Sequence, residues 1–143
     1  MRRREGHNWV HIDEMPVEPG VPFGDAIVKA FAARDFLDTH SKDDELLATT
    51  PQLSPDVELE PRFQPSDEGW EMISMNLSLK KGVPASLALD PKVADFLGNC
   101  TGKHTLDSLI QDLASNADAA HEQVRLECLR LVRRLIERGF MVV

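Results

Sequence analysis

The side chains that could act as nucleophile, base or metal ligand are scattered along this chain of 143 residues. A catalytic site needs such groups in a defined constellation. The histidines do not form the His-Glu-x-x-His pattern of zinc enzymes. They are His7, His11, His40, His104 and His121. Cys100 and His104 are four residues apart, but Gly102 lies between them, and this spacing favours a structural turn over a metal or nucleophilic site.

Phosphate-binding loops are also missing from the sequence. No Gly-x-Gly occurs, and Gly102-Lys103-His104 lacks both the earlier glycine and the hydroxyl residue of a P-loop. The acidic groups Asp43-Asp44-Glu45 and Asp67-Glu68 follow no EF-hand pattern and are typical of solvated loops. We therefore expect no cofactor and no metal, and we find no catalytic site to assign.

One basic group stands out near the C-terminus, in a segment predicted to be helical. Arg130, Arg134 and Arg138 recur at every fourth residue, and Arg133 lies beside them. Arginines at this spacing could contact DNA phosphates or another partner. The same helix also carries four acidic residues against five arginines, so its net charge is only +1. These four arginines are the candidate interaction surface, although a solvated or internally paired face is the more usual role of such a row.

Composition narrows the function classes further. Hydrophobic residues make up 42% and charged residues 28%, as in globular domains. The net charge is −8, of which −7 falls in residues 1–85, and an acidic chain repels nucleic acid. No apolar run approaches the roughly 18 residues of a membrane span, and residues 1–8 contain no apolar segment of the kind that makes a signal peptide. We expect a cytoplasmic, soluble protein with two reduced thiols, Cys100 and Cys128.

The first 85 residues predict an extended lead, a helix and a β-hairpin. Prolines and glycines block a helix before residue 24, and Ile27, Val28 and Phe31 then recur at helical spacing to about Leu37. A short helical turn is expected over 43–47. The aromatic residues of this half are more typical of core or interface anchors than of a stacking platform: Trp9, Phe23, Phe31, Phe36, Phe63 and Trp70.

Two alternating segments, 57–63 and 73–79, predict the hairpin. Pro61 lacks a backbone donor and indicates an edge strand or a bulge there. Trp70 and Met72 are even-numbered, whereas Ile73, Met75 and the apolar residues after them are odd-numbered. In a regular strand these two sets point to opposite faces, so the parity changes at Met72. This change of parity predicts either a bulge near Met72 or a strand start that is covered on both faces.

The last third, residues 86–143, predicts a short strand, three capped helices and a closing strand. Asp90-Pro91 and Thr105 are favoured helix starts, and Asp118 can cap the third helix. Gly139 lies where a left-handed C-terminal cap belongs, before an apolar strand over 140–143. The expected fold is α+β, with subdomains at 1–85 and 86–143 in one compact unit, and the second is winged-helix-like.

Four segments resemble the C-terminal region of bacterial class I S-adenosylmethionine-dependent methyltransferases. They are Gly6-His7-Asn8-Trp9 with Ile12-Asp13, Phe31-Ala32-Ala33-Arg34-Asp35-Phe36-Leu37, Leu89-Asp90-Pro91-Lys92-Val93, and Val132-Arg133-Arg134-Leu135-Ile136-Glu137-Arg138-Gly139-Phe140. In that family the glycine-rich cofactor loop and the Asn-Pro-Pro-Tyr motif lie upstream of this region. This chain has no Tyr and no Asn-Pro, so the resemblance transfers no catalytic or cofactor residue.

The resemblance implies a non-catalytic accessory module, cut from a methyltransferase or encoded separately, that docks the catalytic domain or its substrate. The last third also resembles small winged helices that bind precursor peptides by adding them to a sheet edge. The alternative is therefore an independent winged-helix module that binds a peptide or DNA. In either case we expect a protein or peptide partner, with nucleic acid disfavoured and no membrane involved.

Overall fold

The computed structural model describes residues 24–80, 85–116 and 120–143, and these ranges confirm the α+β class. The extended lead expected over residues 1–23 lies outside them. The helices are α1 (Gly24–Thr39), α2 (Asp43–Leu47), α3 (Pro91–Gly98), α4 (Leu106–Ser115) and α5 (His121–Glu137). The strands are β1 (Gln52–Leu53), β2 (Val57–Ser66), β3 (Gly69–Leu79), β4 (Ser86–Leu89) and β5 (Met141–Val142).

The strands form two antiparallel sheets. The larger has the order β2-β3-β4, so β2, which contains Pro61, is an edge strand as predicted. The smaller sheet pairs β1 with β5, in the register Gln52 to Val142 and Leu53 to Met141. The predicted strand after the last helix therefore finds its partner about 90 residues earlier in the sequence, within the first half of the chain.

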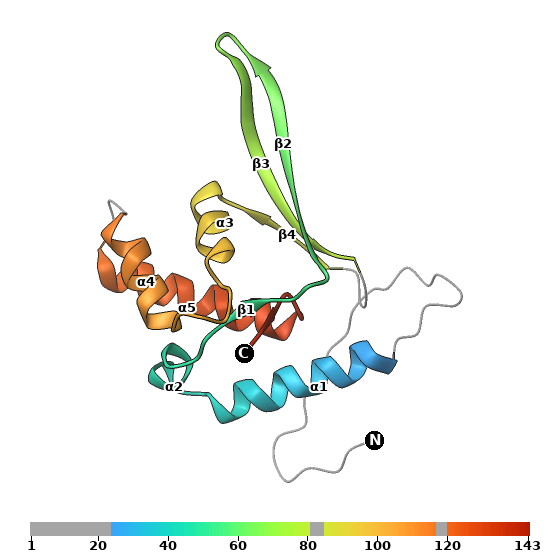
Figure 1. The fold of residues 1–143 in the computed structure, drawn as a ribbon, viewed down its shortest axis with the longest axis vertical. Helices are drawn as coiled ribbons and strands as arrows, with labels where there is room; N and C mark the ends of the chain where they lie inside the picture. The colour runs from blue at the N-terminus through green and yellow to red at the C-terminus, as the bar shows by residue number, and fades with distance from the viewer. Residues whose placement is uncertain (1–23, 81–84, 117–119) are drawn as a thin grey trace.

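The hairpin of β2 and β3 is a long projection, which we call the arm. Beyond the part of the arm that pairs with β4, it extends well away from the helices (Figure 1). Ser66 and Gly69 close its tip, where the Ser66 hydroxyl donates to the Gly69 carbonyl over 3.1 Å. Gly69 has φ +122°, a conformation that residues with a Cβ rarely adopt.

Local capping fixes the starts of two helices as the sequence predicts. The Asp90 carboxylate accepts from the Lys92 backbone N–H over 2.8 Å, and Pro91 occupies the first turn of α3. The Thr105 hydroxyl accepts from the Ser108 N–H at the start of α4. Asp118, the predicted cap of the third helix, lies outside the described residues, and α5 begins at His121 after Ala120.

The end of α5 is a Schellman cap centred on Gly139. Its φ is +80°, so the left-handed cap predicted there is confirmed. The Gly139 N–H donates to the Ile136 carbonyl, and the Phe140 N–H donates to the Leu135 carbonyl over 2.9 Å. The cap turns the chain back, so that Phe140 and Met141 are buried and β5 can reach β1.

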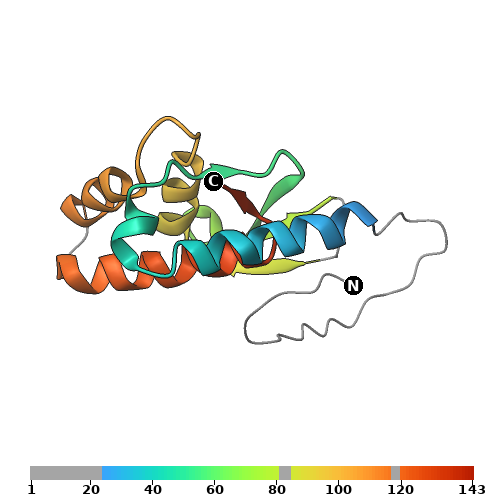
Figure 2. The same ribbon diagram turned by 90° about the horizontal axis from the view of Figure 1, so that it is seen from below.

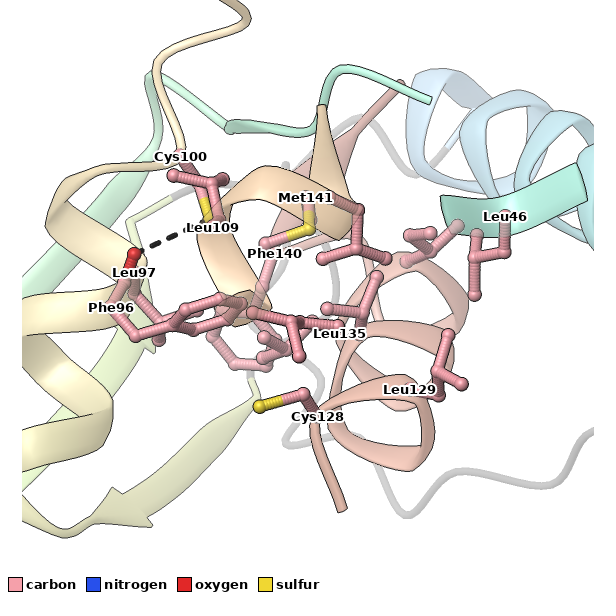
Figure 3. Packing of buried hydrophobic residues seen from close by; sticks show 14 of the residues in the cluster. Leu46, Phe96, Leu97, Cys100, Leu109, Cys128, Leu129, Leu135, Phe140 and Met141 are labelled. Atoms are coloured by element: carbon pink, nitrogen blue, oxygen red, sulfur yellow. Dashed lines mark hydrogen bonds between the residues drawn. The ribbon is translucent and has the colours of Figure 1, made fainter. Parts of the chain in front are cut away.

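One hydrophobic core joins both halves of the chain (Figure 3). Leu46 and Leu47 from α2 and Leu77 from β3 belong to the same buried cluster as α4 and α5. On α5 the buried side chains follow helical spacing, as its apolar stripe predicts. They are Val124, Cys128, Leu129, Val132, Leu135 and Ile136. The predicted boundary at residue 86 therefore does not separate two cores within the described ranges.

Helix α1 lies along α5 on one side of the molecule (Figure 2). The apolar spacing correctly predicts the helix, but Ile27 and Val28 are exposed. Contact with the core comes instead from Ala33, Phe36 and Leu37 in its second half. No side chain of α1 is fully buried, so the helix is attached to the surface of the core.

Among the described residues, no helix combines the length and apolar character that a membrane crossing requires.

Candidate functional site

Both thiols are free, buried and poor nucleophiles. Burial, and to a smaller extent the nearby Cys128, raise the pKa of Cys100 to about 12. The pKa of Cys128 is raised to about 11 by burial first and by Glu127 second. The Cys100 thiol donates weakly to the Phe96 carbonyl at 3.5 Å (Figure 3). Because the thiolate is the reactive form, neither side chain is suited to nucleophilic attack at neutral pH.

The described histidines are not assembled with other ligating groups. His104 is exposed while Cys100 is buried, so the two do not face a common pocket. His40 stacks on Phe36, with ring centroids 4.0 Å apart, and its Nδ1 lies 3.0 Å from the Phe36 carbonyl. Nowhere in residues 24–80, 85–116 and 120–143 do three His, Cys, Asp or Glu side chains gather as a metal site would require.

The structure divides the four candidate arginines into two kinds. Arg130, Arg134 and Arg138 are exposed on the outer side of α5. Arg133 instead points to the corner between α1 and α2. Its guanidinium donates to the His40 carbonyl and the Ser41 carbonyl, each over 3.0 Å. The sequence spacing placed these residues on one helix but could not show that one of them has an internal role.

A third contact completes the Arg133 tether. Its guanidinium also forms an ion pair with Asp43 over 3.1 Å. Nearer the start of α5, Arg125 forms an ion pair with Asp44 over 3.4 Å. Both carboxylates belong to the cluster that the sequence analysis assigned to a solvated loop. Both are exposed, as expected, and their ion pairs also link α2 to α5. Arg130, Arg134 and Arg138 remain as a possible contact surface.

A larger candidate surface is the apolar face of the arm. Paired residues of β2 and β3 share a face, and the pairs Leu59 with Leu77 and Pro61 with Met75 place apolar side chains together. The register shifts after Arg62, because Arg62 pairs with Ser74 whereas Phe63 pairs with Met72, so Ile73 is an extra residue. Of the two alternatives that the change of parity left open, the structure has the bulge.

The bulge keeps the apolar face continuous to the tip. Without the extra residue, Met72 and Trp70 would turn to the other side of the sheet, because a one-residue shift reverses every side chain. With it, Met72 lies beside Phe63 and Trp70 beside Pro65. The opposite face of the arm carries the polar residues. These are Glu58, Glu60, Arg62, Gln64 and Ser66 on β2 and Glu71, Ser74, Asn76 and Ser78 on β3.

Exposure along this face increases from base to tip. On β3, Leu77 is 2% exposed and Trp70 at the tip 74%, whereas on the edge strand β2, Leu59, the partner of Leu77, is 44% exposed and Phe63 52%. The prediction that these aromatic residues are core residues is wrong for Phe63 and Trp70, whereas their possible role as interface anchors stays open. The alternation of apolar and polar residues indicates which side chains share one face of the arm. It does not indicate that the outer half of this face packs against no core.

A cavity of about 310 Å³ lies at the base of the same face. The arm contributes Val57, Leu59 and Leu77 to its walls, and α3 contributes Ala94 and Leu97. Leu89 of β4 and the segment around Pro55 complete it, and Ser54 is the one polar side chain among the residues that line it. The cavity and the exposed part of the arm therefore form one continuous apolar surface.

The charged groups of the arm are mainly acidic and lie away from the apolar face. Residues 57–79 carry five carboxylates and one basic residue, Arg62. Glu58, Glu60 and Glu71 lie on the polar face, and Asp67 and Glu68 lie in the turn at the tip. Glu58 also forms an ion pair with Lys80.

Together the fold and this surface define an α+β domain with an exposed apolar arm and, within the described residues, no assembled catalytic or metal-binding group. The chain belongs to a family of domains of unknown function, DUF7782, whose profile matches residues 29–143. That match begins within α1 and includes the arm and the three C-terminal helices. No curated protein matches the chain.

Proposed function

We propose that this chain is a non-catalytic recognition module that binds another protein through the apolar face of its arm. The main support is the exposure of Phe63, Trp70 and Ile73 on a projection that covers no core. Contiguous exposed apolar surface on a folded domain marks an interaction site, and tryptophan is enriched among the residues that dominate binding energy. Burying one such side chain stabilises a complex by about 1.5–3 kcal/mol.

The resemblance to methyltransferase C-terminal regions suggests the partner class. We propose a S-adenosylmethionine-dependent catalytic domain, in the same chain or a separate one, or the protein that it modifies. The protonated thiols Cys100 and Cys128 are compatible with the cytoplasm, where this function would be carried out.

The DNA-binding alternative rests on Arg130, Arg134 and Arg138, which α5 leaves exposed. Their helix carries nearly balancing acidic groups, and the arm is strongly acidic. We therefore rank this alternative second.

Site-specific photocrosslinking in the source cells tests the docking function. Trp70 is replaced by p-benzoylphenylalanine, and the matched control carries the same amino acid at the adjacent Glu71, which is exposed on the polar face. We expect a discrete cross-linked protein from position 70 and little from position 71. A catalytic domain in the same chain would give an internal cross-link instead.

Equal cross-linking from both positions, or none from either, would overturn the proposal. Identification of the cross-linked region by mass spectrometry then distinguishes a methyltransferase catalytic domain from a different protein.

A further inference from the structure

The arm has a free edge along the outer side of β2. In the part of the chain that the structure describes, β2 pairs with β3 alone, and its residues from Leu59 to Ser66 are exposed. An unpaired edge can present backbone N–H and C=O groups to a strand of another chain, and some domains bind extended peptides in this way. The orientation of the backbone groups of β2 therefore decides whether the arm can do so.

Backbone hydrogen bonds at the base of the arm show which residues of β2 face this edge. The Val57 N–H donates to the Ser54 carbonyl over 3.1 Å. The N–H of Leu79, which is the β3 partner of Val57, donates to the Ala85 carbonyl over 3.3 Å. Since neither N–H is directed at the partner residue, Val57 and Leu79 form a non-hydrogen-bonded pair. The backbone groups of Val57 therefore point away from β3.

The same orientation recurs at every second residue of β2, because hydrogen-bonded and non-hydrogen-bonded pairs alternate in an antiparallel ladder. The bulge does not interrupt this alternation on β2, since its extra residue, Ile73, belongs to β3. Beyond the base, the residues that face the free edge are Leu59, Pro61, Phe63 and Pro65. Both prolines thus lie where the ladder to β3 requires no N–H.

These prolines remove donors that an added strand would need. Of the four residues that face the free edge, only Leu59 and Phe63 have an N–H. Because a proline follows each of them in this set, no two successive positions along the edge can both donate. From this register we infer that Pro61 and Pro65 close the free edge of the arm to strand addition, so that a segment of another chain does not extend this sheet.

The closed edge specifies how the arm recognises a partner. With strand addition barred, contacts come from side chains, and the apolar face presents Phe63 and Trp70. This step rests on the proposed docking function, whereas the closure of the edge does not. It disfavours, for this sheet, the alternative in which an extended peptide is added to the edge. A partner that presents a preformed side-chain surface fits the arm better.

Hydrogen exchange of the full chain, resolved by residue with NMR spectroscopy, tests the register. The amides of Leu59 and Phe63 should exchange at least about tenfold faster than those of Glu60 and Gln64, which are directed at β3. Equal exchange of the two sets would show that Leu59 and Phe63 do not face an open edge, and it would overturn the inference.

Restoring the missing donors tests the closure itself. The double variant Pro61→Thr with Pro65→Thr supplies an N–H at both positions and a residue type that favours strands. Gln64→Thr places the same side chain on β2 where the N–H is already directed at β3, and it serves as the matched control. We expect the double variant to self-associate through its free edge and to show a larger mass by light scattering than the wild type and the control.

Edge pairing in the double variant should also slow exchange of the Leu59 and Phe63 amides by about tenfold or more. An unchanged mass, association without slower exchange at these two amides, or equal association of Gln64→Thr would overturn the inference. Each of these results would leave face-specific cross-links from position 70, and with them the docking function, intact. Conversely, an absence of cross-links would overturn the docking function but not the closure of the edge.

Discussion

Arg133 shows how a residue's role depends on the groups that surround it. Its neighbours in the arginine row point to solvent, whereas Arg133 donates to two backbone carbonyls and pairs with Asp43. These contacts satisfy the carbonyls where α1 ends and the chain turns into α2. Arg133 therefore holds the first two helices against α5 and does not contribute to an outer contact surface.

Arg133→Met should lower the free energy of unfolding by about 1–3 kcal/mol, because it removes charge-assisted hydrogen bonds to two carbonyls and one ion pair. The control Arg134→Met changes an exposed position on the same helix and should alter stability by less than about 0.5 kcal/mol. Urea unfolding followed by circular dichroism measures both variants. Equal effects of the two substitutions would contradict the assigned role.

At the scale of the elements, helix ends and the bulge follow from interactions within a few residues. The caps at Asp90, Thr105 and Gly139 and the parity change before Ile73 could all be predicted, because each depends on local geometry. By contrast, the packing face of α1 depends on where α5 lies. Ile27 and Val28, whose spacing indicates the helix, are therefore exposed, and Phe36 and Leu37 make the contact with the core.

Two glycines at or near helix ends should respond to alanine in opposite directions. Gly139 has φ +80°, where a Cβ costs about 1–2 kcal/mol, so Gly139→Ala should destabilise the protein by that amount. Gly98 has open space for a Cβ within α3, so Gly98→Ala should stabilise it by up to about 1 kcal/mol. Thermal unfolding of both variants checks the pair, and a stabilised Gly139→Ala protein would contradict the cap.

At the scale of the whole molecule, one core draws α2, β3 and the C-terminal helices together, while the arm extends beyond it (Figure 1). The acidic groups of the arm and the exposed arginines of α5 are on different elements, so the charge of the chain is unevenly distributed.

A duplex DNA fragment should therefore show no electrophoretic shift with the full chain, even at low salt, because the net charge is −8. The double variant Arg130→Ala with Arg134→Ala should behave like the wild type. A salt-dependent shift that disappears in this variant, but persists in Lys103→Ala, would instead support DNA binding.

The sequence alone determined the caps at Asp90, Thr105 and Gly139 and the hairpin, and it reduced the change of alternation near Met72 to two alternatives, because these features depend on hydrogen bonds and side-chain alternation within a few residues. It also determined that no cofactor loop is present. The tertiary structure decided the pairing of β1 with β5, the tether made by Arg133, and the exposure of Phe63 and Trp70. Each of these depends on segments far apart in the chain, whose contacts, or lack of them, arise only when the core assembles.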